Sequence, residues 1–151
     1  MATNFKSFKS LREYLNDVPF INCGGCGYSA FFIYEFLKSK DKKPEIAFIY
    51  DGGNDNFDTN EAILKKHENL KPSSCAHAVV KVGEFAYDSS GIHKWQDTLD
   101  QWSEGNDLYH IVTEDFLLKA LANRIKWNDM FDRDQEVPVM EKKIGLNLPT
   151  S

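Results

Sequence analysis

Hydrophobic residues recur along the chain at spacings that distinguish helices from strands. Between Phe5 and Leu15 they follow at three- and four-residue intervals, which predicts an amphipathic helix that ends near Pro19. The segment 28–37 is apolar on nearly every side, so a buried central helix is expected there. The next expected elements are a strand over 45–50, a polar loop over 51–58 and a short helix over 60–68.

A β-hairpin is predicted in the second half of the chain. The runs 76–82 and 85–88 flank Gly83-Glu84, which is typical of two strands joined by a two-residue turn. The ordered part is completed by a helix around Trp95, Leu99 and Trp102, a strand over 108–112, and a helix over 114–127 with Thr113 as its N-cap.

The order of these elements indicates the fold class. Helices before and after a run of antiparallel strands are typical of an α+β architecture. The chain has 151 residues, of which 42% are hydrophobic and 13% aromatic, so it can bury one core and we expect a single domain over 1–151. The tail 129–151 is mixed in character, and we expect it to wrap the domain or to be partly disordered.

Charge and hydropathy argue against two classes of partner. The formal net charge is −5, with acidic and basic residues interspersed, so no basic surface is expected for nucleic acid. No apolar run approaches the roughly 20 residues that span a bilayer, so no membrane partner is expected. The first residues also lack a secretory signal, and we expect a cytoplasmic protein.

Three cysteines direct attention to thiol chemistry. Cys23, Cys26 and Cys75 are too few, and odd in number, for a disulfide-stapled scaffold. Cys26 stands at the start of the predicted central helix, where unpaired N–H groups and the helix dipole favour a thiolate. The glycines around Cys26 let the backbone turn sharply and let a substrate carbonyl approach, and the N–H of Cys26 can donate to an oxyanion. This pattern is suited to acyl transfer.

A base and its orienting group are predicted on the hairpin. With Gly83-Glu84 as the turn, Val82 pairs with Phe85, and Asp88 opposes Val79. Asp88 is then diagonal to His77 on the same face of the sheet, at a Cα separation of about 7–8 Å that lets the two side chains meet. His77 can therefore serve as the base, and Asp88 can fix its tautomer.

Two stretches carry a resemblance to known families. Residues 23–30 (CGGCGYSA) are similar to the segment around the nucleophile of papain-like peptidases, in which a Cys-Gly-small-Cys-aromatic run opens the central helix and the second cysteine attacks. Residues 77–91 (HAVVKVGEFAYDSSG) resemble transglutaminase-like proteins and arylamine acetyltransferases, in which histidine and aspartate lie on neighbouring strands. The order Cys, His, Asp is shared, and the matching pieces cover about a quarter of the chain.

The resemblance implies a papain-like (transglutaminase-like) fold, with the cysteine-bearing helix packed on a small antiparallel sheet. It also implies a cysteine hydrolase or acyltransferase, a peptidase or amidase first of all, that uses a thioester intermediate and no cofactor. Cys26 would be the nucleophile, His77 the base and Asp88 its orienting partner. The expected substrate is a peptide, a protein or a small amide.

The sequence departs from the papain-like pattern at two positions. Phe20 stands where these enzymes have the glutamine that completes the oxyanion hole, and Asn22 is the nearest amide that could replace it. Gly27, rather than an aromatic residue, follows the nucleophile. We therefore assign the oxyanion or substrate-binding role to Asn22, Gly25 and Gly27.

Functions from other classes remain alternatives. Four soft ligands could form a structural Cys₃His zinc site, although this leaves Asp88 unexplained; they are Cys23, Cys26, Cys75 and His77. The Cys-Gly-Gly-Cys run also resembles the motif of thiol-disulfide oxidoreductases, whose folds need a strand before the motif where a helix is predicted here. A binding module that keeps the fold without turnover is the third alternative.

Each residue of the proposed triad also has a simpler interpretation, as a buried thiol, a core histidine or a turn aspartate. Their combination is what favours catalysis. The remaining histidines, namely His67, His93 and His110, are expected to be solvated. The stripe of Trp95, Leu99 and Trp102 is expected to be core rather than a stacking surface.

Overall fold

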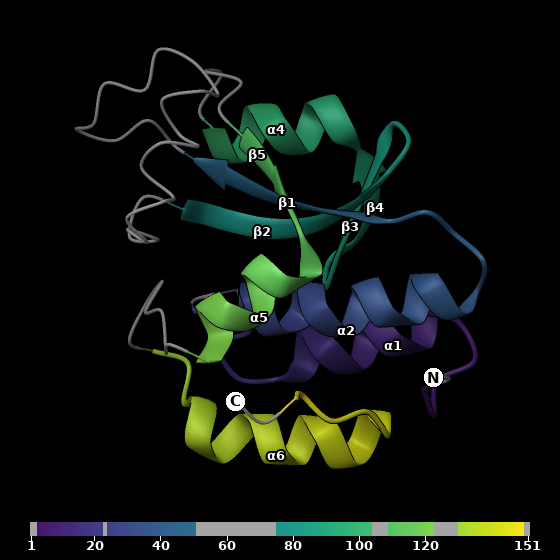
Figure 1. The fold of residues 1–151 in the computed structure, drawn as a ribbon, viewed down its shortest axis with the longest axis vertical. Helices are drawn as coiled ribbons and strands as arrows, with labels where there is room; N and C mark the ends of the chain where they lie inside the picture. The colour runs from purple at the N-terminus through teal and green to yellow at the C-terminus, as the bar shows by residue number, and fades with distance from the viewer. Residues whose placement is uncertain (1–2, 23, 51–74, 104–108, 123–129, 150–151) are drawn as a thin grey trace.

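The computed structural model describes residues 3–22, 24–50, 75–103, 109–122 and 130–149 (Figure 1). These residues form a mixed α+β structure with five helices and a five-stranded antiparallel sheet. In chain order the elements are α1 (Phe8–Asp17), α2 (Cys26–Ser39), β1 (Glu45–Tyr50), β2 (Cys75–Val82), β3 (Phe85–Asp88), β4 (Gly91–Lys94), α4 (Trp95–Ser103), β5 (Tyr109–Val112), α5 (Glu114–Ala122) and α6 (Arg133–Ile144).

The strand order in the sheet is β4-β3-β2-β1-β5, and every neighbouring pair is antiparallel. The predicted hairpin is confirmed with its register, because Val82 pairs with Phe85 and Val80 with Tyr87. Strand β4 was not predicted. It pairs along β3 with Asp88 opposite Gly91, whose φ of 133° is a conformation that favours glycine.

The sheet separates two unequal layers of helices (Figure 1). Helix α4 covers one face, while α1, α2 and α5 cover the other and α6 lies beyond them. The larger core lies on the α2 face and includes Phe32 and Phe48, neither of which is exposed. A smaller core on the α4 face contains Ala47, Ile49, Val79, Ala86 and Leu99.

The two N-terminal helices follow the sequence pattern. Helix α1 begins after Ser7, whose side chain accepts a hydrogen bond from the Ser10 N–H, and it buries Leu11 and Leu15. Helix α2 begins after Gly25 and has no side-chain N-cap. Ten of its fourteen residues are buried, so the predicted central helix is confirmed.

The C-terminal part contains a helix where the sequence analysis expected only a wrapping or partly disordered tail. Helix α6 is capped by Asp132, which accepts from the Gln135 N–H at 3.1 Å, and it ends at Gly145 with a φ of 81°. Pro138 inside the helix obscured it in the sequence. The helix packs through Val137, Met140 and Ile144.

Several sequence predictions fall outside the described residues: the polar loop over 51–58, the helix over 60–68, and the end of the helix predicted over 114–127. Among the residues that the structure describes, no helix is both long enough and apolar enough to cross a membrane.

Candidate active site

Cys26 is the first residue of α2 and a free, buried thiol with 3% of its surface exposed. Because no side chain caps this helix, the N–H groups of its first turn have neither an intrahelical acceptor nor a side-chain cap. These groups and the helix dipole stabilise negative charge at the position of the thiol. The predicted placement of Cys26 at a helix start is confirmed.

Gly25 has a packing role. A Cβ atom at this position would lie 2.7 Å from a ring carbon of Phe131 and 2.9 Å from the carbonyl oxygen of Ile21. The glycine therefore makes room for an aromatic ring of the same chain. Gly27 is buried in the first turn of α2. The oxyanion role of both glycines stays a prediction that would rest on their backbone N–H groups.

His77 and Asp88 meet across the hairpin. The Nε2 atom of His77 on β2 lies 3.1 Å from Oδ2 of Asp88 at the end of β3. His77 is 1% exposed and Asp88 is 7% exposed. The diagonal contact that the register predicted is therefore present, and it holds a buried imidazole against a carboxylate.

The second oxygen of Asp88 is held by the turn that follows β3. Its Oδ1 atom accepts hydrogen bonds from the Ser90 N–H at 2.9 Å and from the Ser90 hydroxyl at 2.6 Å. The Nε2 atom of His93 lies 3.6 Å away and also bonds the Ser90 hydroxyl at 2.8 Å. His93 is thus partly solvated, as expected, but it also belongs to the shell around Asp88. These contacts fix the carboxylate that faces His77.

The electrostatics of the site favour a protonated His77. Burial alone would lower the pKa of this histidine, but hydrogen bonds and charge interactions with Asp88 and Cys26 outweigh it and raise the pKa to about 9. Burial would likewise raise the pKa of Asp88, but hydrogen bonds from His77 and Ser90 and the charge of His77 lower it. Cys26 is thus among the groups that raise the pKa of His77.

Trp102 of α4 is part of the site. Its ring stacks on the His77 imidazole with 4.0 Å between centroids and 19° between planes. Leu99 is buried in the core of the α4 face, and Trp95 and Trp102 pack against it as the helical spacing predicted. The prediction that this stripe is core is therefore confirmed, and Trp102 in addition contacts the histidine of the site.

Asn22 is linked to the aspartate turn. The Ser89 hydroxyl donates to its Oδ1 atom at 3.2 Å, although Asn22 itself is exposed. The bond joins the segment that leads into α2 to the turn after β3, and so ties the two halves of the site together. Whether its amide serves the oxyanion stays a prediction.

The zinc alternative is only partly covered by the structure. Cys23 and the side chain of Cys75 lie outside the described residues. Within the described part, no group of three or more His, Cys, Asp or Glu side chains could hold a metal ion.

Of the other histidines, His67 lies outside the described residues and His110 on β5 is half-buried rather than fully solvated.

No protein-family model, curated protein or solved structure matches the chain.

Proposed function

We propose that this protein is a cysteine peptidase or amidase of papain-like or transglutaminase-like type, with Cys26 as nucleophile, His77 as base and Asp88 as the group that orients His77. The observation that carries the proposal is the contact between the buried His77 and Asp88, on strands that pack against the helix that begins at Cys26. A thiol, a base and an orienting carboxylate from three separate elements are what nucleophilic catalysis needs.

The protonation states suit acylation. Nε2 is committed to Asp88, which leaves Nδ1 as the ring atom for the proposed proton exchange with the Cys26 sulfur. The pKa of His77, raised to about 9, favours the imidazolium form at neutral pH. The thiolate attacks a substrate carbonyl to form the C–S bond, the imidazolium gives its proton to the leaving amine, and the C–N bond breaks.

Deacylation uses the same histidine in its neutral form. His77 takes a proton from water or from an acceptor amine, the oxygen or nitrogen attacks the thioester, and the thiolate leaves. Water gives a hydrolase and an amine gives a transferase. Trp102 restricts the imidazole to the plane that faces Asp88, and its π-face stabilises the imidazolium.

The fold supports the same family assignment at the level of layout. The cysteine-bearing helix α2 packs against β2 of a small antiparallel sheet, and the histidine and aspartate lie on the neighbouring strands β2 and β3. We propose a papain-like or transglutaminase-like fold on this basis.

The proposal is tested by the rate at which iodoacetamide alkylates the protein as a function of pH. Mass spectrometry maps the modified cysteine, and zinc is measured on the same sample. Cys26 should react fast well below about pH 8, where an ordinary thiol is mostly protonated. The His77→Ala variant should react slowly. His110→Ala is the matched control, because it removes a half-buried histidine from another strand and should leave the rate unchanged.

Two results would reject the proposal. Stoichiometric zinc, with thiols that react only after a chelator is added, would establish the metal-binding alternative. If Cys26 does not react and the sample holds no zinc, Cys26 is not an activated nucleophile. The same follows if the His77→Ala variant is alkylated at the rate of the wild type.

A further inference from the structure

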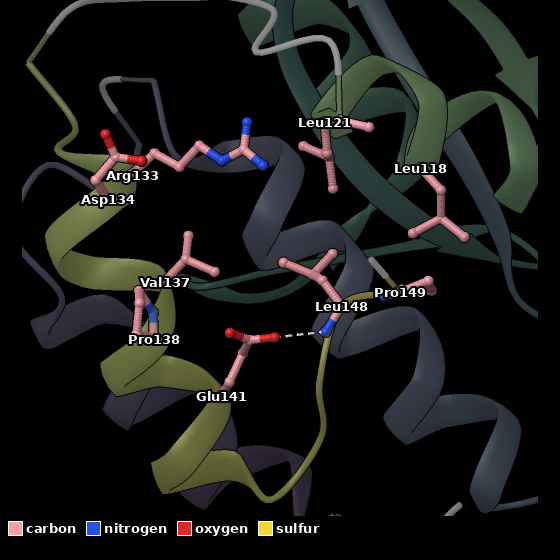
Figure 2. Close-up of a pocket in the computed structure, with 10 residues that line it drawn as sticks. Leu118, Leu121, Arg133, Asp134, Val137, Pro138, Glu141, Leu148 and Pro149 are labelled. Carbon is pink, nitrogen blue, oxygen red and sulfur yellow. Dashed lines mark hydrogen bonds between the residues drawn. The ribbon is translucent and has the colours of Figure 1, made fainter. Parts of the chain in front are cut away.

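A cavity of about 470 Å³ lies between α5, α6 and the segment that follows α6 (Figure 2). Each of these three elements contributes apolar side chains to its wall. Leu118 and Leu121 come from α5, Val137 from α6, and Leu148 from the segment after α6. Its size falls in the range of about 300–1,000 Å³ that is typical of sites for small molecules. None of the residues proposed for catalysis lines it.

Arg133, the first residue of α6, brings a positive charge to one end of the cavity. Figure 2 shows its side chain reaching from α6 towards Leu121. The guanidinium lies over the ring of Tyr28 at 5.8 Å, and its Nη1 atom is closed off from solvent. Among the described residues it makes neither a hydrogen bond nor an ion pair. The guanidinium is thus held by an aromatic ring, and no described residue accepts a hydrogen bond from its Nη1 atom.

Glu141 lies at the opposite end of the cavity, and its charge is already engaged. Its carboxylate accepts a hydrogen bond of 2.7 Å from the Leu148 N–H, the bond drawn in Figure 2. This bond holds the C-terminal segment in place as a wall of the cavity. Among the described charged residues that line the cavity, Arg133 is thus the one with a buried side-chain nitrogen that has no hydrogen-bond partner.

We propose that this cavity binds a small monocarboxylate with an apolar body, through a charge-assisted pair between its carboxylate and Arg133. A guanidinium matches a carboxylate with two parallel hydrogen bonds, and the leucine and valine side chains match an apolar body. Asp134 and Glu141 also line the cavity, so each negative charge beyond the one that pairs with Arg133 adds repulsion, which favours a single carboxylate. The site is independent of the chemistry proposed for Cys26.

N-acetyl-leucine and its neutral amide, N-acetyl-leucinamide, form a matched pair of probes. Binding is followed by NMR through the methyl signals of Leu118, Leu121, Val137 and Leu148. The acid should shift these signals and bind about tenfold or more tightly than the amide, because a hydrogen-bonded charge pair adds roughly 1.5–3 kcal/mol. Arg133→Gln should remove this preference, and Arg133→Lys should retain part of it. Arg12→Gln, on α1, is the matched control and should change neither affinity.

Equal affinity for the acid and the amide would overturn the proposal. So would unchanged binding of the acid in Arg133→Gln, or the absence of methyl shifts at millimolar acid. If Arg133→Gln does not fold, Leu121→Trp fills the cavity without touching the charge, and binding of the acid that survives this change would also overturn it.

Discussion

The two faces of the sheet bury different kinds of side chain. The α2 face is lined by large apolar residues such as Phe48 and Val80, neither of which is exposed. The α4 face has a small core around Val79, and next to it a buried imidazole and carboxylate, His77 and Asp88. Burial of apolar surface stabilises the first face directly, whereas burial of charge on the second face is unfavourable until the partners pair. We infer that the α2 face provides most of the stability, whereas the α4 face holds the histidine and the aspartate of the proposed site.

The largest effect is expected from a cavity on the α2 face. Phe32 on α2 is not exposed, so Phe32→Ala should lower the free energy of unfolding by about 3–5 kcal/mol. Phe85→Ala is the matched control, because this side chain is 49% exposed and its loss should change stability by about 0.5 kcal/mol or less. Urea denaturation measures both. Equal losses in the two variants would refute the assignment of the main core to this face.

The next effect concerns the polar pair of the α4 face. Burial lowers the pKa of His77, and the negative charge of Asp88 counteracts this effect. Asp88→Asn removes that charge, so the pKa of His77 should fall from about 9 by about 1–3 units. NMR titration of the His77 ring protons measures this, and alkylation of Cys26 near neutral pH should slow in parallel. Asp97→Asn, at an exposed position of α4, is the control. An unchanged His77 titration in Asp88→Asn would show that the carboxylate does not set the protonation state.

The pH dependence of stability should carry the signature of His77. Its pKa in the folded protein, about 9, lies above the unfolded value of about 6.5. The protonated form therefore stabilises the fold fully below about pH 6.5, and this contribution is lost as the pH rises through about 9.

Urea unfolding at a series of pH values measures the effect, and His77→Gln should flatten the curve between these limits. Asp88 acts in the opposite sense, because its lowered pKa makes its contribution disappear only in acid. A stability curve of the wild type that is level from pH 6.5 to about 9 would contradict the assignment.

The smallest effect is expected from the aromatic support of the histidine. Trp102→Leu removes a ring that stacks on the imidazolium, an interaction of about 0.5–2 kcal/mol, so the pKa of His77 should fall by less than in Asp88→Asn. Trp95→Leu is the control, because Trp95 packs edge-on against Tyr109 instead. If both variants shift the His77 titration equally, the stacking has no specific role.

Local patterns accounted for the hairpin and for the start of the central helix. The two-residue turn at Gly83-Glu84 set the register of β2 and β3, and side-chain alternation then placed His77 and Asp88 on one face. The glycines before Cys26 ended the preceding segment, and the apolar run after it defined α2. Such features depend on neighbours in the sequence, so the sequence determined them.

Contacts between distant segments were decided only by the tertiary structure. Gly91–Lys94 has no strong strand pattern and becomes β4 because it pairs with β3. The stacking of Trp102 on His77 and the packing of Phe131 against Gly25 join elements far apart in the chain. The approach of Cys26 to His77 likewise requires α2 to pack on β2. Periodicity identifies the face that a residue occupies within its element, but packing decides which element covers that face.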